Sequence, residues 1–210
     1  MSENTEQGKG LTLILMRHCE DVRRGYEGND KESPLTDKGK TQAAAMGQYI
    51  DELEMAPDFV LCANCERAKE TLKGMGLDVP EDQIAVTEDL YSGSADEYIQ
   101  KMQMLEMEYP KAAGAKKLLD IGRRPAGPEA VEELTGHSDK AVPSEEYDHG
   151  TISVIRFDDI DEWKSLFSRA KGLAKGTLLN VAQPGPDGQV VELVGDQGPE
   201  YGAPLDELGF

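Results

Sequence analysis

The sequence predicts an α/β fold in which a mostly parallel central sheet carries helices on both faces. Two observations lead to this prediction. Short apolar runs rich in strand formers alternate along the chain with longer segments of helical periodicity. The first of these runs, Leu11–Met16, is almost uniformly apolar, which is typical of a parallel strand buried on both faces. The 210 residues include 38% hydrophobic residues and three cysteines, which suits an ordinary core without a disulfide framework.

The predicted elements follow one another in a regular order. After the strand at residues 11–16 and a charged loop, Thr36 is the expected N-cap of a helix that extends to about Glu54. Further strands are predicted at residues 58–63, 84–87, 117–121 and 177–182, and a half-exposed edge strand at 151–157. Further helices are predicted at residues 67–73, 95–109, 128–134 and 161–170.

The two ends of the chain differ from the middle in composition. Residues 1–10 are polar and are predicted to be a disordered tail. Residues 185–210 are rich in proline, glycine and acidic side chains, and are predicted to be an acidic tail that carries at most one short strand, at 189–194. Residues 11–184 therefore form the predicted single domain.

The charge of the chain excludes several classes of partner. It has 41 acidic and 22 basic residues, for a net charge of −19. This argues against nucleic acid and against anionic membranes as partners. No apolar run is long enough to span a bilayer, and residues 1–10 lack the pattern of a targeting peptide, so we expect a cytoplasmic protein.

Polar residues follow three of the predicted strands. Arg17 and His18 follow the first strand, Arg67 follows the second, and Arg123 follows the strand at 117–121. The carboxyl ends of parallel strands meet at one edge of a sheet, where ligands usually bind. Converging guanidiniums bind phosphate, and an imidazole among them can act as a nucleophile. The alternative is that Arg17 and His18 only cap a strand end.

Several segments resemble known motifs in the correct order. Leu13–Glu20 resembles the opening motif of the histidine phosphatase superfamily, also called the phosphoglycerate mutase-like superfamily. Further resemblances to its segments lie at residues 33–43 (PLT-x-x-G-x-x-QA), 62–71 (S-P-x-x-RA-x-x-T), 90–93 and 150–155, while 163–184 resembles the end of the SixA-type phosphohistidine phosphatases. The resemblance covers residues 11–184.

The resemblance implies both a fold and a reaction. The fold would be a three-layer sandwich whose mostly parallel sheet has one antiparallel strand. The function would be that of a metal-independent phosphatase without cofactor, in which His18 becomes phosphorylated and Arg17 and Arg67 bind the phosphate. Its partner would be a phosphorylated protein or a small phosphorylated molecule; the oligomeric state stays open.

Two positions depart from the family pattern. Where the family has G-H-N-P, with a second pocket histidine, this chain has Gly122-Arg123-Arg124-Pro125. Arg123 can bind phosphate but cannot exchange a proton near neutral pH. A phosphate-binding pseudophosphatase with little turnover is therefore the alternative function. Ser92 stands where mutase-like members have a glutamate, which disfavours mutase activity.

Other residues are candidates for accessory roles. Cys19 and His149 could approach the same sheet edge, and His149 could replace the missing histidine; without it, we expect no second histidine step in the pH–rate profile. Cys62 and Cys65 form a C-x-x-C pair that could be a redox or metal site; alternatively, both are small pocket residues. His137 is expected in a surface loop.

Overall fold

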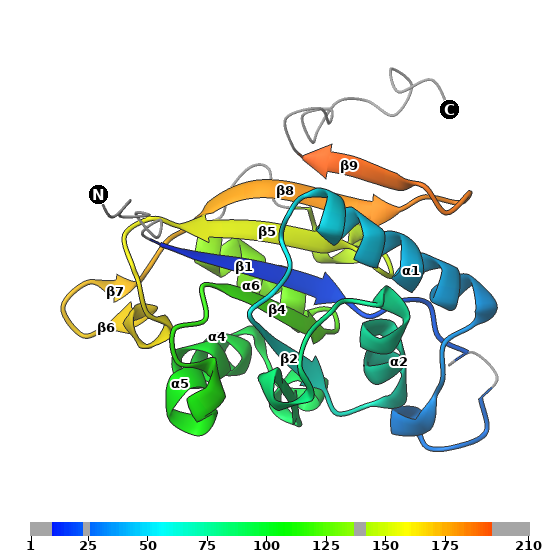
Figure 1. Ribbon diagram of the computed structural model, residues 1–210, viewed down its shortest axis with the longest axis horizontal. Helices are drawn as coiled ribbons and strands as arrows, with labels where there is room; N and C mark the ends of the chain where they lie inside the picture. Colours follow the sequence, from blue (N-terminus) through cyan, green and yellow to red (C-terminus); the bar gives the residue numbers. More distant parts are fainter. Residues whose placement is uncertain (1–9, 23–25, 137–141, 195–210) are drawn as a thin grey trace, which may run out of the picture.

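The computed structural model describes residues 10–22, 26–136 and 142–194. Their main feature is a seven-stranded sheet with the order β3-β2-β4-β1-β5-β8-β9 (Figure 1). The strands are β1 Leu11–Arg17, β2 Phe59–Ala63, β3 Ile84–Thr87, β4 Lys117–Gly122, β5 Ile152–Phe157, β8 Thr177–Pro184 and β9 Val190–Val194. The strands β3, β2, β4 and β1 pair in parallel, whereas β5, β8 and β9 each pair antiparallel to a neighbour. The mostly parallel sheet is thus confirmed, although both β5 and β9 run against the others.

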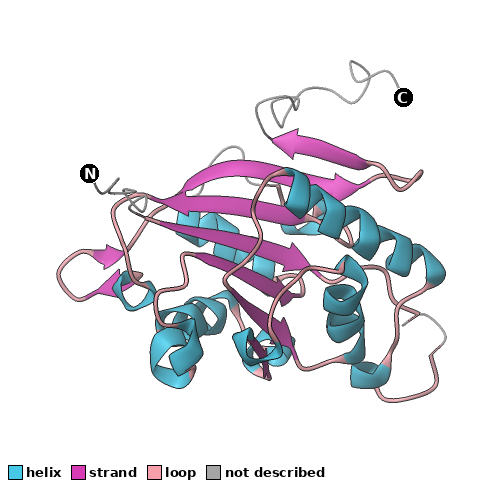
Figure 2. Ribbon diagram, in the orientation of Figure 1, coloured by secondary structure: helices cyan, strands magenta, loops and turns pink. Residues whose placement is uncertain are grey.

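Helices cover both faces of this sheet, as predicted (Figure 2). They are α1 Asp37–Glu52, α2 Glu66–Met75, α3 Asp89–Ser92, α4 Ala95–Gln103, α5 Leu105–Glu108 and α6 Ala126–Thr135. The helices α1 and α2 pack against each other, while α6 packs on β1 and β5 and against α4. Thr36 caps α1 as predicted, because its hydroxyl accepts a hydrogen bond from the backbone of Gly39 at 2.9 Å.

A close contact between α1 and α2 sets the position of the second helix. At Gly47, an added Cβ would lie only 1.9 Å from the carbonyl oxygen of Met75, so only glycine allows this approach. Because α2 also carries Arg67, the packing of these helices places that side chain at the sheet edge.

The strand β1 lies inside the sheet, and all seven of its residues are buried. Its parallel partner β4 aligns Arg17 with Gly122, and its antiparallel partner β5 aligns Met16 with Ile152. The chain segments after β1 and β4 and before β5 therefore start from one edge of the sheet.

The strand predicted at the edge is in fact internal. β5 lies between β1 and β8, and most of its residues are buried. The alternation that indicated exposure came partly from Ser153, which is 1% exposed and hydrogen-bonded to the hydroxyl of Tyr147 at 3.0 Å. A polar side chain with a buried partner looks the same in sequence as one that faces solvent.

The prediction of a helix at residues 161–170 is wrong. The segment forms a 3₁₀ turn, Trp163–Ser165, and then a hairpin of β6 Phe167–Ser168 and β7 Gly172–Leu173. Trp163 is buried and its indole donates to the carbonyl of Ala115 at 2.9 Å, so a tertiary contact fixes this aromatic side chain. The helix predicted at 95–109 is interrupted at Met104, which separates α4 from α5.

The end of the described chain belongs to the sheet. Residues 190–194, where the sequence allowed one short strand within a tail, form β9 against β8. Within the described ranges, none of the helices has the length and apolar character needed to cross a membrane. Residues 1–9 and 195–210, and His137, lie outside the described residues.

Candidate active site

The backbone holds three segments together where β1 ends. The amide of His18 donates to the carbonyl of Gly122 at 3.0 Å, which extends the parallel ladder by one residue. From the other side, the amide of Gly150 donates to the carbonyls of Arg17 at 3.1 Å and His18 at 3.2 Å. Arg123 and His149, the chain neighbours of these glycines, are thereby brought to the edge that carries His18.

His18 is 3% exposed, and its ring has a defined orientation. Its Nδ1 lies 2.8 Å from the carbonyl oxygen of Cys19, which can only accept, so Nδ1 carries the proton and Nε2 keeps its lone pair. Burial lowers the pKa of His18 well below its ordinary value. The charges of Arg67 and Arg17, and that of His149 when it is protonated, lower it further. His18 is therefore neutral near pH 7, which a nucleophilic imidazole requires.

Arg17 is buried beside His18 and is fixed by two acceptors. Its Nη1 donates to the carbonyl oxygen of Tyr147 at 2.7 Å, and its Nη2 lies 2.8 Å from Nε2 of His149. A guanidinium has no acceptor atom, so the second contact is a donation to the His149 lone pair. Arg17 thus adds positive charge next to the nucleophile.

Arg67 reaches the same site from α2 and is 1% exposed. Its guanidinium donates to the backbone oxygen of Asp30 at 2.7 Å and to the Asp30 carboxylate at 3.0 Å. The Tyr91 hydroxyl donates to the same carboxylate oxygen at 2.9 Å. A phosphate at Arg67 would compete with the Asp30 carboxylate, an anion that this pocket already accommodates.

Two further guanidinium donors are buried and, in the part of the chain that the structure describes, have no partner. Within the described ranges, the Nε atoms of Arg67 and Arg123 are buried and have no hydrogen-bond acceptor. Buried donors of this kind are rare and usually mark a ligand, an ion or a water molecule. Arg123 is half-buried, and its backbone amide donates to the Tyr98 hydroxyl at 3.1 Å. The site has the donors that an oxyanion needs.

The predicted accessory residues differ in their surroundings. Cys19 is buried, and burial raises the pKa of its thiol to about 12, so the thiol is neutral. Ser92 is exposed, and its hydroxyl donates to the carbonyl of Glu88 at 3.3 Å. Hydrogen bonds from Lys31 and Lys101 lower the pKa values of the Glu88 and Asp89 carboxyls, respectively, which makes both poor proton donors.

Cys62 and Cys65 are both free thiols and buried. Burial raises the pKa of Cys62 to about 12 and also raises that of Cys65. A reactive cysteine needs a stabilised thiolate, and burial here favours the neutral form. These properties fit two small pocket residues better than a redox pair.

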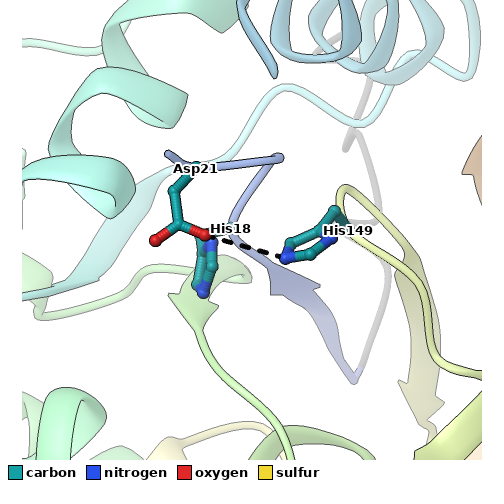
Figure 3. A group of neighbouring side chains, drawn as sticks. All are labelled: His18, Asp21 and His149. Atoms are coloured by element: carbon teal, nitrogen blue, oxygen red, sulfur yellow. Dashed lines mark ion pairs between the residues drawn. The ribbon is translucent and has the colours of Figure 1, made fainter. Parts of the chain in front are cut away.

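One donor atom each from His18, Asp21 and His149 lies within 4.8 Å of the others (Figure 3). Two imidazoles and a carboxylate are a donor set that transition metals accept. Two guanidiniums already interact with this group, because Arg17 donates to His149 and Arg67 lies 3.8 Å from a carboxylate oxygen of Asp21. Their positive charges favour an anion over a cation at this point.

Sequence reasoning did not identify Asp21, Asp30 or Asp120. The first two lie in a loop with many charges, so nothing in the sequence distinguished them. Asp120 lies in the middle of β4 and is fully buried, and neither carboxyl oxygen has a partner within the described ranges. Burial raises its pKa well above the ordinary value. The sequence signal that could have identified Asp120 was its position as a charged residue inside the apolar run 117–121.

Comparison with known proteins agrees with this geometry. The sequence profile described as the histidine phosphatase superfamily (branch 1) matches residues 13–169, more than half of the chain. The SixA protein of Nakamurella multipartitia is 26% identical, with a TM-score of 0.67, over 83% of this chain and 96% of that chain. The protein histidine phosphatase SixA in complex with tungstate has the same fold, at 21% identity and a TM-score of 0.65, over 83% of this chain and 97% of that one.

A curated relative matches over a shorter stretch. The acid phosphatase of Mycobacterium tuberculosis (strain ATCC 25618 / H37Rv) is 39% identical over 71 residues, which is 33% of this chain and 35% of that protein. The chain thus spans about a third of the length of this relative. The chain belongs to the histidine phosphatase superfamily, and within it to the SixA-like proteins. The family and these relatives support phosphatase hydrolase activity.

Proposed function

We propose that the chain is a metal-independent phosphatase that forms a phosphohistidine at His18. The observation that carries this proposal is the state of that side chain. His18 is buried and neutral, and its Nδ1 proton is held by the Cys19 carbonyl, so Nε2 keeps its lone pair. The charges of Arg67 and Arg17 act on this ring. Arginine charge next to a neutral imidazole is what attack on a phosphate dianion requires.

In the proposed reaction, the substrate phosphate binds to Arg17, Arg67 and Arg123. Nε2 of His18 attacks the phosphorus in line, the P–N bond forms, and the bond to the leaving group breaks. Water then attacks the phosphorus, the P–N bond breaks, and inorganic phosphate leaves. The guanidiniums stabilise the negative charge on the phosphoryl oxygens in both steps.

The proposed substrates are phosphohistidine on a protein or small phosphoesters. The SixA names among the similar structures support the first class. The acid phosphatase relative supports the second class. We also propose that the protein is cytoplasmic.

Turnover of a phosphohistidine peptide and of 4-nitrophenyl phosphate tests this function. The wild type should hydrolyse at least one of them, and His18→Ala should abolish the activity. Calorimetry with inorganic phosphate should show binding to the wild type. Turnover that persists in His18→Ala would contradict the proposal.

A pseudophosphatase is the second candidate, and the observation in its favour is Arg123. This residue directly follows Gly122, the hydrogen-bond partner of His18, and it cannot titrate near neutral pH. Phosphate binding without turnover of either substrate would support this candidate over the enzyme.

A further inference from the structure

His149 is held next to His18 by its position in the chain. It precedes Gly150, whose amide is bound to the carbonyls of Arg17 and His18, so its backbone cannot move away without breaking these bonds. The rings of His18 and His149 have centroids 5.4 Å apart and are tilted by 52°. The His149 side chain is 28% exposed, so it lies at the mouth of the site while His18 lies inside.

Nε2 of His149 lies between a positive and a negative group. Nη2 of Arg17 donates to it at 2.8 Å. Oδ1 of Asp21 lies 3.9 Å away from it (Figure 3). With Arg17 as donor, Nε2 carries the lone pair, so the ring is neutral with its proton on Nδ1. The Asp21 side chain is 3% exposed, and it also accepts a hydrogen bond from Ser33 at 3.1 Å.

Among the described residues, the charges around His149 have two opposing effects on its protonation. Arg17 and His18 disfavour its protonation, whereas Asp21 disfavours the neutral form, and Arg67 acts on Asp21 from the far side. Glu20 adds a second carboxylate, because a protonated His149 would contribute to lowering the pKa of Glu20, after the larger effect of Lys38. The balance between these effects decides whether the ring carries a proton.

A bound phosphate would shift this balance in one direction. The phosphate oxygens compete for the N–H groups of Arg17, which frees the Nε2 lone pair of His149. The dianion also adds negative charge within reach of the ring, and both effects favour the imidazolium. Phosphate binding therefore also favours the protonated form of His149.

We propose that His149, with the Asp21 carboxylate favouring its protonation, is the proton-transfer group of this pocket. The inference rests on the proposed function. As Nε2 of His18 forms its bond to phosphorus, the proton on Nε2 of His149 passes to the leaving-group oxygen, and the P–O bond breaks. When water cleaves the P–N bond, its proton returns to His149, so the protons balance over one turnover.

This assignment divides the work of the missing pocket histidine between two residues. Arg123 supplies a fixed positive charge, and His149 supplies the group that titrates. It revises the expectation of a pH–rate profile without a second histidine step. Neither Ser92, Glu88 nor Asp89 has the surroundings of a proton donor, whereas His149 is beside the nucleophile.

Leaving groups of different basicity test the inference. In His149→Gln, the amide can still accept from Arg17 but cannot supply a proton. Phenyl phosphate, whose leaving oxygen needs a proton, should lose about a hundredfold or more in rate, because general acids contribute at least that much. 4-Nitrophenyl phosphate, whose leaving group is stable as an anion, should lose about tenfold or less. The control Asp148→Asn, at an exposed neighbour, should leave both rates unchanged.

The pH–rate profile gives a readout that a structural role would not move. The wild type should lose phenyl phosphate activity on the alkaline side as His149 deprotonates, and this limb should be absent in His149→Gln. Equal losses for both substrates, with an unchanged profile, would overturn the inference while leaving the phosphatase itself intact.

Nitrogen NMR of the imidazoles tests the inference without turnover. The chain has three histidines, so the His149 signal can be assigned by its absence in His149→Gln. Inorganic phosphate should raise the pKa of His149 in the wild type, and an unchanged pKa on saturation would overturn the proposal. If no substrate is hydrolysed, the proposed function fails, but this titration still decides whether phosphate protonates His149.

Discussion

The neighbouring strands β1 and β4 end at the same edge of the sheet, yet their polar groups are supported in different ways. After β1, Nδ1 of His18 is bound to the Cys19 carbonyl, and Arg17 donates to the Tyr147 carbonyl and to His149. Within the described ranges, Asp120 on β4 has two carboxyl oxygens without a partner, and Arg123, directly after β4, has a buried Nε without an acceptor.

This difference separates two kinds of functional residue. Side chains that must be aligned for bond formation are already held by backbone carbonyls, so little reorganisation is needed when substrate arrives. Arg123 has an unused donor, which suits a group whose partner is the ligand itself. Nothing in the surroundings of Asp120 gives it such a role, and a buried carboxyl without hydrogen bonds costs stability.

The first prediction concerns Arg67 and has the largest expected effect. Arg67→Lys keeps the charge on α2 but loses the fork that can hold two phosphate oxygens. We expect kcat/KM to fall by about a hundredfold or more, as after loss of one oxyanion donor. Steady-state kinetics with 4-nitrophenyl phosphate measures this.

The matched control for that change is Arg124→Lys. Arg124 is exposed and donates to the carbonyls of Ser144 and Glu145, outside the proposed pocket. It should leave kcat/KM near the wild-type value. Similar losses in both variants would remove the distinction between pocket and surface arginines.

The second prediction concerns Arg123 at the end of β4. Arg123→Ala should lower kcat/KM by about ten- to a hundredfold, because one phosphate contact is lost while His18 remains in place. Arg123→His should raise kcat above that of the wild type if the arginine holds phosphate too tightly. Wild-type activity in Arg123→Ala would mean that this side chain does not contact phosphate at all.

The third prediction concerns Asp120 and stability. Asp120→Val removes a buried group without hydrogen bonds and should raise the free energy of unfolding by about 1–3 kcal/mol. Urea denaturation measures this, with Asp159→Asn at an exposed position as the control. A destabilised Asp120→Val would contradict this prediction, because the carboxyl would then make stabilising contacts in the folded protein.

The pH dependence of that stability has a defined sign. Burial raises the pKa of Asp120 in the folded protein above that of the unfolded chain, which is about 4. The folded protein therefore holds the proton more tightly, and the resulting stability is present below about pH 4 and declines as the pH rises toward the folded-state pKa. Asp120→Val should lack this decline, and parallel curves for both proteins would contradict it.

Much of the sheet could be predicted because its strands are apolar and their ends are marked by polar residues. The run 11–16 became β1, and the alternation of strand and helix gave the mostly parallel sheet. The edge position predicted for the strand at 151–157 and the helix predicted at 161–170 were wrong, because polar or aromatic residues there have tertiary partners. Ser153 binds Tyr147, and Trp163 binds the Ala115 carbonyl. Local periodicity contains no information about such partners.

The site residues also divide into those that the sequence could predict and those that it could not. Arg17, His18 and Arg67 lie in motifs with a fixed relation to strand ends, so their meeting at one edge could be expected. Their roles, and those of Arg123 and His149, stay predictions until measured. Asp21 and Asp30 became visible only through their distances to Arg67 and His149, which loop conformation decides.

Trapping the phosphorylated protein tests the central claim most directly. The wild type is mixed with labelled substrate, quenched within milliseconds in alkali, and digested for mass spectrometry. We predict one phosphate on His18, stable in alkali and released in acid, and none in His18→Ala. A phosphate on any other residue, or turnover by the wild type without phosphorylated His18 in the quenched samples, would contradict the account.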